Sequence, residues 1–244
     1  MIKLFVFGAL LFCFAGFFFL SFGWVPAVHI FAHHIHASGE TTTETRTINS
    51  FSKLNLQSSA HVIVTHGDQT ALTITGDKSA LSVLKTEVKG SELVIWSNEN
   101  YDGDLTIHVT TPNLERVLLE GSGEISAKEF SSQSFEATID GSGDIDASIT
   151  ASKVKADIEG SGVIKLSGTT DQYAAEVAGS GTIESFDLQA KSGSISISGS
   201  GESEVHCTDA LAASVSGSGG IYYKGAPTAL TTTISGSGTI EKRN

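Results

Sequence analysis

The side chains with the clearest potential for chemistry are carboxylates that flank a recurring Gly-Ser-Gly triplet. Glu120, Asp140 and Glu159 each precede a triplet, and Glu124 and Asp144 each follow one. If the triplets stack, like charges lie about 5 Å apart and repel by roughly 1 kcal/mol in water, and a divalent cation relieves that repulsion. The pattern predicts a weak calcium or magnesium site. The alternative is a solvated acidic face that limits self-association.

Two further groups have metal-binding character. Residues 98–104 resemble the start of a calcium loop, but Val109 occupies the twelfth position, where a bidentate Glu belongs. Four histidines lie close together before the first acidic residue, and such a cluster can bind a transition metal ion: His29, His33, His34 and His36. Cleavage of an export segment after Ala37 would remove this cluster. We therefore expect no cofactor beyond weakly bound calcium or magnesium.

Groups suited to catalysis are scattered along the chain. His61, His66, His108 and His206 are not paired with a nucleophile in any recognisable motif. Cys207 shares its parity with Val205 and is expected in the core rather than in a disulfide. The turns are short, whereas enzymes built on β-helices place their acids and bases in long loops. The sequence predicts a non-enzymatic protein, with a surface polysaccharide-processing enzyme as the alternative.

The triplets form a structural repeat with a spacing of 18 to 20 residues. A fixed period of this size indicates one supersecondary unit stacked on copies of itself. The glycines of the seven triplets are Gly121 and Gly123, Gly141 and Gly143, Gly160 and Gly162, Gly179 and Gly181, Gly199 and Gly201, Gly217 and Gly219, and Gly236 and Gly238. We predict that they line one corner of a coil, with the serines between them stacked outward. Replacing Gly143 or Gly181 with Val should therefore cost more than an ordinary surface change.

The residues around each triplet alternate with a period of two, which indicates strands. Phe135, Ala137 and Ile139 share one parity, and the residues between them are polar. The alternation continues through both glycines, and it recurs in the last repeat at Leu230 and Ile234. An all-β, parallel β-solenoid of about 19 residues per turn fits this pattern, in a single elongated domain.

The region before the first triplet keeps the alternation without the triplet. Residues 45–244 are expected to form the solenoid, with irregular first turns at 45–120 and regular turns at 121–240. At the same period, the first part would make about four coils. A short helical turn competes with strand only over residues 80–88.

The N-terminus indicates export. Residues 4–24 form an apolar run rich in Phe, and Lys3 is the only charge before Glu40. Residues 1–37 are therefore expected to be either a signal peptide or an uncleaved membrane anchor. The formal net charge of −12 makes nucleic acid an unfavourable partner. We expect a periplasmic, outer-envelope or cell-surface location, with membrane contact only through the N-terminal segment.

Four stretches resemble a known bacterial family. They are residues 46–56 (RTINSFSKLNL), 61–68 (HVIVTHGD), 93–96 (LVIW) and 110–123 (TTPNLERVLLEGSG). In this order they resemble the auto-transporter adhesin head domain family, or head GIN domain, over roughly residues 45–240. The resemblance implies a right-handed parallel β-helix on exported or envelope proteins and supplies no catalytic residue. The expected function is a binding or structural module with an unknown surface ligand, either a glycan or a protein.

Overall fold

The computed structural model describes residues 34–244. The apolar run at 4–24 lies outside the described residues, as do His29 and His33, so the predictions of an export segment or anchor are not addressed by this structure. The described residues contain a single core that extends from Phe51 to Ile221. Among residues 34–244, no helix is both long and apolar enough to cross a membrane.

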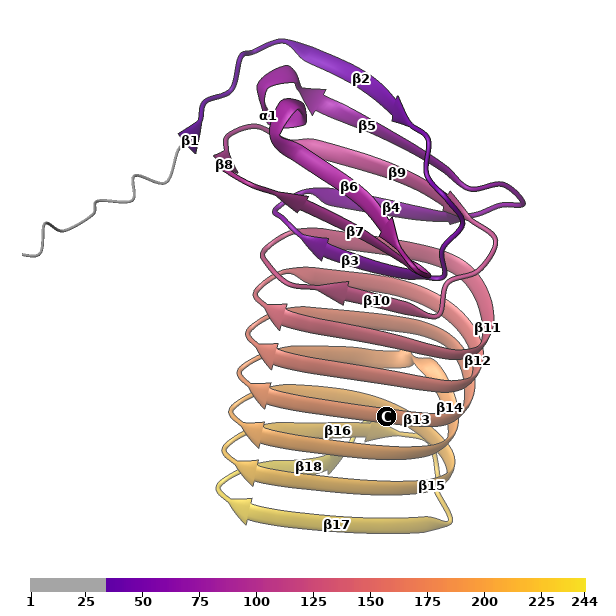
Figure 1. The fold of residues 1–244 in the computed structure, drawn as a ribbon. Helices are drawn as coiled ribbons and strands as arrows, with labels where there is room; N and C mark the ends of the chain where they lie inside the picture. Colours follow the sequence, from indigo (N-terminus) through magenta and orange to yellow (C-terminus); the bar gives the residue numbers. More distant parts are fainter. Residues whose placement is uncertain (1–33) are drawn as a thin grey trace, which may run out of the picture. The chain divides into compact units, whose positions relative to one another are not determined.

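Five long parallel strands form the regular part of the molecule (Figure 1). They are β11 (Glu124–Gly141), β12 (Asp144–Gly160), β13 (Val163–Gly179), β14 (Thr182–Gly199) and β15 (Glu202–Gly217). Each strand runs from one Gly-Ser-Gly corner to the next and pairs with the coils before and after it. Gly141 lies opposite Gly160, and Gly160 lies opposite Gly179, so the repeat period is one turn of the solenoid. The parallel β-solenoid is confirmed.

The alternation read from the sequence describes the core correctly. Phe135, Ala137 and Ile139 are 2%, 0% and 0% exposed, and the same parity is buried in the following coils. Burying one aliphatic side chain contributes roughly 1.5 to 3 kcal/mol, so stability accumulates coil by coil. The last coil departs from the pattern. Leu230 and Ile234 are 45% and 48% exposed, because their strand, β17 (Ala229–Gly236), pairs with β15 on one side only.

The triplet positions require glycine because the preceding coil passes close to each corner. A β-carbon on the first glycine of a triplet would meet the carbonyl oxygen of the equivalent glycine one coil earlier, as at Gly179, where Gly160 O would be 2.5 Å away. From the second triplet onward, the first glycine also has a φ of 120° to 149°, which L side chains rarely adopt. The crowding at the corner runs along the stack, because adjacent coils hydrogen-bond directly through the corner.

The chain before the triplets forms fewer coils than the repeat period predicts. The strands are β1 (His34–Ile35), β2 (Thr41–Arg46), β3 (Lys53–Gln57), β4 (His61–His66), β5 (Ala71–Asp77), β6 (Leu84–Lys89), β7 (Glu92–Ser97), β8 (Asn100–Tyr101), β9 (Leu105–Thr111) and β10 (Arg116–Leu119). The one helix among the described residues, α1 (Lys78–Val83), follows β5. Two coils form here, rather than about four. Strands β3 and β4 make up one coil, and strands β7 and β9 make up the other, which lies parallel to it. Strands β2, β5 and β6 pair antiparallel with their neighbours and fold back over the end of the stack (Figure 1).

The order of these layers differs from their order in the sequence. β3 pairs with β7 on one side and β10 on the other, and β4 lies between β9 and β11. The coil of β3 and β4, which comes first in the chain, therefore lies between the coil of β7 and β9 and the regular coils. At the other end, β16 (Gly220–Lys224) and β18 (Thr239–Lys242) continue the sheet beyond β15. The long strands also turn midway along their length, which gives each regular coil a second corner (Figure 1).

Candidate functional site

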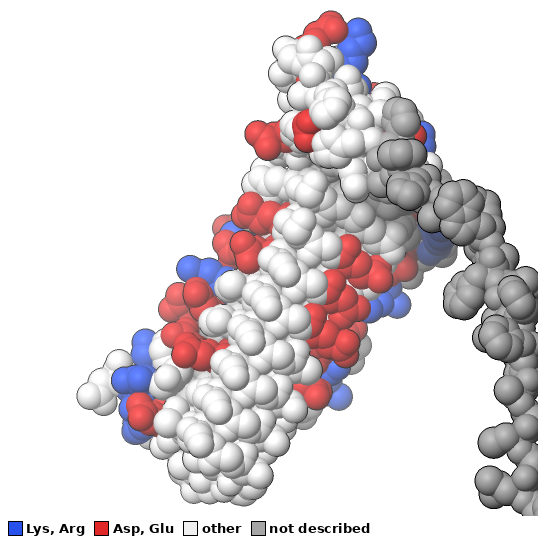
Figure 2. Space-filling model, turned by 90° about the vertical axis from the view of Figure 1, so that its left-hand side faces the viewer, with Lys and Arg blue, Asp and Glu red and all other residues white. Residues whose placement is uncertain are grey.

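The structure aligns the five predicted carboxylates into two short columns beside the glycine corner. Glu124 lies opposite Asp144, and Asp140 lies opposite Glu159. Glu120 precedes Gly121, whose carbonyl oxygen accepts a hydrogen bond from the Ser142 N–H of the next coil at 3.1 Å. All five residues are exposed. Figure 2 shows acidic side chains gathered along both flanks of an uncharged ridge that follows the stack.

These columns place like charges side by side without making a convergent cation site. Glu120 accepts hydrogen bonds from the amides of Asn55 and Gln57 at 2.8 and 2.6 Å, and Glu124 lies 3.8 Å from His61 Nε2. Over residues 34–244, one group of three or more Asp, Glu, His or Cys side chains brings its ligand atoms within 4.8 Å of one another, and it contains none of the five. A calcium or magnesium ion would have to bridge neighbouring coils by moving these side chains.

Two of the scattered groups suited to catalysis, His66 and Cys207, are packed against or within the core. His66 packs edge-on against Phe130, with ring centroids 5.9 Å apart. Cys207 is fully buried, and burial raises the pKa of its thiol to about 11, so it is not an activated nucleophile. The Tyr173 hydroxyl is also buried, and burial raises its pKa.

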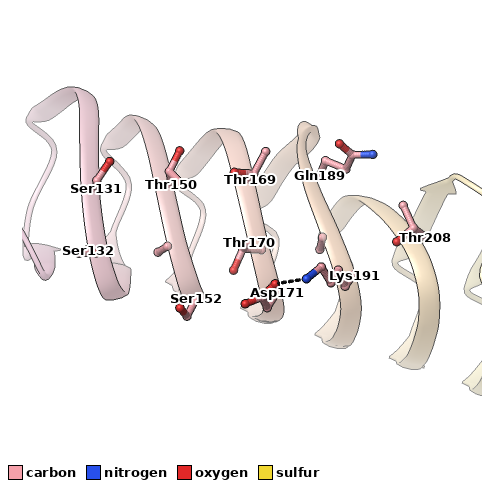
Figure 3. Close-up of a pocket in the computed structure, with 12 residues that line it drawn as sticks. Ser131, Ser132, Thr150, Ser152, Thr169, Thr170, Asp171, Gln189, Lys191 and Thr208 are labelled. Carbon is pink, nitrogen blue, oxygen red and sulfur yellow. Dashed lines mark ion pairs between the residues drawn. The ribbon is translucent and has the colours of Figure 1, made fainter.

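A groove at the second corner is the site that the sequence reading missed. Its volume is about 630 Å³, and it crosses several successive coils (Figure 3). Twelve residues line it: Ser131, Ser132, Thr150, Ala151, Ser152, Thr169, Thr170, Asp171, Gln189, Ala190, Lys191 and Thr208. We call this surface the hydroxyl groove, because most of its polar lining is Ser or Thr. It holds no aromatic ring.

One column of the groove is free to bind a ligand. Ser131 lies opposite Thr150, Thr150 opposite Thr169, and Thr169 opposite Gln189. Each of these four side chains is exposed, and none makes a hydrogen bond to another residue of the described chain. Parallel strands lie about 4.8 Å apart, so the column offers hydrogen-bonding groups at that interval.

The lower rim of the hydroxyl groove carries charge. Asp171 Oδ1 lies 2.6 Å from Lys191 Nζ, and this hydrogen bond raises the pKa of Lys191. Asp171 is the one carboxylate among the lining residues. Glycoside hydrolysis uses two carboxyl groups on either side of the scissile bond, and the groove supplies one, already paired. Its arrangement is suited to binding a polar chain.

A second groove lies beside the first and is more strongly charged. Its volume is about 820 Å³. Four cations line it, namely Lys53, Arg116, Lys153 and Lys155, together with the acids Glu115 and Glu136. Two of the cations have partners: Arg116 lies 3.4 Å from Glu136, and Lys155 lies 2.6 Å from Asp157, a hydrogen bond that raises the pKa of Lys155. Much of its charge is thus neutralised locally.

The hydroxyl groove had a signal in the sequence. Ser131, Thr150, Thr169, Gln189 and Thr208 follow the first glycine of the preceding triplet by nine or ten residues. Aligning the repeats on the triplet therefore places a polar residue within one position of the same place in five consecutive coils. The parity of a single coil does not reveal this column, because outward polar residues occur at every second position.

These features define an all-β protein with a parallel solenoid body, a glycine corner and polar grooves at the opposite bend of each coil. Residues 50–227 match the family model described as "Putative auto-transporter adhesin, head GIN domain". The chain belongs to this family. No curated protein matches it.

Solved structures from three bacteria have the same fold. A "putative adhesin" from Bacteroides fragilis is 25% identical, with a TM-score of 0.79, over 86% of this chain and 100% of that one. A "putative lipid binding protein" from Parabacteroides distasonis is 27% identical, with a TM-score of 0.71, over 87% and 100%. A "putative adhesin" from Parabacteroides merdae is 20% identical, with a TM-score of 0.66, and shows the fold alone. The family and these neighbours are described as adhesins or a binding protein, which suggests a surface or exported binding role.

Proposed function

We propose that this protein is a non-enzymatic binding module of the cell envelope or surface, and that its hydroxyl groove binds a glycan chain. The observation that carries the proposal is the column from Ser131 to Gln189, whose hydrogen-bonding groups have no partner within the described chain. A polyhydroxyl chain laid along the stack would meet a new donor and acceptor at every coil. Family membership supports this reading, because an adhesin acts by binding.

The charge distribution supports a polar ligand that is not strongly anionic. The hydroxyl groove contains one carboxylate and one ammonium group, which neutralise each other. The acidic flanks and the net charge of −12 oppose binding to nucleic acid. Residues 4–24 would provide attachment to a membrane or would be removed after export. N-terminal sequencing of the protein from its native envelope distinguishes these two fates.

A glycan array probed with the full chain in detergent tests the ligand class. The double variant Thr150→Val with Thr169→Val removes two hydroxyls while keeping the side-chain shape. Each neutral hydrogen bond contributes about 0.5 to 1.5 kcal/mol, so the loss of two should lower the affinity by roughly 5- to 150-fold. Thr138→Val is the matched control, because Thr138 lies outside the hydroxyl groove.

The same experiment separates binding from catalysis. Glycans that bind should be recovered intact after prolonged incubation. Release of shorter saccharides would establish the polysaccharide-processing alternative instead. An array without a bound glycan, or equal affinity of the double variant and the native protein, would overturn the assignment of the hydroxyl groove as a glycan site.

A further inference from the structure

A cluster of two histidines and one aspartate lies at the beginning of the described chain, away from the hydroxyl groove. Strand β1 pairs in parallel with β8, which places His34 opposite Asn100. The Asp102 N–H donates to the carbonyl oxygen of Ile35 at 2.8 Å. Because side chains alternate along a strand, His34 and His36 lie on the same side of β1, next to Asp102.

The ligand atoms of these three side chains converge. His34 Nε2 lies 2.7 Å from Asp102 Oδ1, and His36 Nδ1 lies 2.9 Å from Asp102 Oδ2. The two imidazole rings are 5.2 Å apart between centroids. All three ligand atoms fall within 4.8 Å of one another. The cluster is open to solvent, with side-chain exposures of 43% for His34 and 49% for Asp102.

The segment that carries the histidines is held on the body by a second aspartate. Asp77 Oδ2 accepts hydrogen bonds from the Ser38 hydroxyl at 3.0 Å and from the Gly39 N–H at 2.8 Å. Asp102 itself precedes Gly103, whose φ of 95° turns the chain back into β9. The spacing of the three ligands is therefore fixed by backbone pairing on one side and by Asp77 on the other.

The chemistry of the donor set favours a transition metal. Zinc is bound by imidazole nitrogen and carboxylate oxygen, and three protein ligands leave a fourth position open. Calcium and magnesium prefer sites made of oxygen ligands alone.

We propose that His34, His36 and Asp102 bind one zinc-class dication per chain, and that the metal fastens the segment at 34–40 to the loop at 98–104. On binding, the metal replaces the two direct contacts between the histidines and the carboxylate. The site is distinct from the acidic columns and does not depend on the proposed glycan binding. The loop at 98–104 resembles a calcium loop in sequence. In this proposal it instead contributes Asp102 to a site for a zinc-class dication.

Titration calorimetry with Zn²⁺ on the metal-free full chain in detergent tests the proposal. One equivalent should bind, with at least tenfold weaker affinity in Asp102→Asn, the range already seen when outer partners of a metal site are lost. Asp104→Asn is the matched control, since it removes the same charge two residues away and lies outside the cluster. Any heat given by Ca²⁺ should be the same in Asp102→Asn as in the native chain, because calcium prefers sites made of oxygen ligands alone. Unchanged strand circular dichroism of both variants in chelator shows that folding is intact.

Two further measurements distinguish this site from the histidines alone. Co²⁺ should give a d–d absorption spectrum that Asp102→Asn alters, and Zn²⁺ should slow amide hydrogen exchange over residues 34–40 and 98–104. The sequence holds His29 and His33 as well, and an undiminished affinity in Asp102→Asn would assign zinc binding to the histidine segment alone. That result would overturn the proposal, as would the absence of zinc binding by the native chain.

Discussion

The glycine corner gives the sharpest prediction, and Gly162 is the position to change. Its φ lies outside the left-handed region, so alanine brings no backbone strain there. A β-carbon at Gly162 would lie 2.5 Å from the carbonyl oxygen of Gly143 and 2.8 Å from Ile139 Cγ2. Real β-carbon contacts are not shorter than 3.0 Å, so the coils must separate. The backbone hydrogen bond from Val163 N–H to Gly143 O, 3.2 Å long, resists that separation.

Overpacking of this kind costs about 1 to 3 kcal/mol. With about 2 kcal/mol as the central value, the melting temperature of Gly162→Ala should fall by roughly 4 to 8 °C for a body of this length. The matched control is Gly121→Ala at the first triplet. Its φ is also unstrained, but its nearest neighbour, Ser58 O, is 3.2 Å away, so a small adjustment relieves the contact. That variant should stay within about 1 kcal/mol of the native protein.

Thermal and guanidinium unfolding, followed by circular dichroism, measure both variants. In a solenoid each coil contacts only its neighbours, so hydrogen exchange should also show lost protection in β12 and β13 before more distant coils. An equal or larger loss of stability in Gly121→Ala would refute the reasoning, because it would show that crowding along the stack is not what requires glycine at the corner.

Three further predictions concern titration, reactivity and cations. Hydrogen bonds from the backbone and hydroxyl of Ser38, and from the backbone of Ser79 and Gly39, lower the pKa of Asp77 to about 2. The stabilisation by the Asp77 carboxylate should be complete above the unfolded pKa of about 3.9 and should be lost as the pH falls toward 2. The difference in melting temperature between the native protein and Asp77→Asn should therefore close over that pH interval. Because burial raises the Cys207 pKa to about 11, Ellman's reagent should leave Cys207 unlabelled at neutral pH in a folded Cys13→Ser variant and label it in guanidinium; labelling of the folded form would contradict the burial. Millimolar calcium should raise the melting temperature slightly through the acidic columns, and neutralising Asp140 should reduce that rise, whereas neither heat nor a thermal shift with calcium would end the cation hypothesis.

Much of the regular solenoid could be predicted because its information is local and repeated. The triplet spacing sets the length of one coil, and the parity of Phe135, Ala137 and Ile139 sets which side chains enter the core. The repeat predicts burial incorrectly at the end of the stack, where Leu230 keeps the inward parity but remains exposed. Burial there depends on whether another coil covers the strand, and parity does not contain that information.

The candidate site was less predictable from the sequence. The alignment of the acidic residues follows from the register of the triplets, but whether Glu120 is free depended on Asn55 and Gln57, which approach from an earlier layer. The hydroxyl groove required the alignment of several coils at their second corner, where no triplet marks the register. Its free side chains are those without a hydrogen-bond partner in the described part of the chain, and only the folded structure shows which side chains these are.

The sequence by itself determined the strand alternation, the coil length and the family, because each follows from residues close together or repeated at a fixed interval. The tertiary structure alone decided that β3 and β4 lie between the later pair β7 and β9 and the regular coils. It also brought Asp102 to His34 across 68 residues. Long-range pairing depends on which strand edges remain open once the other strands have paired, and local periodicity does not specify that competition.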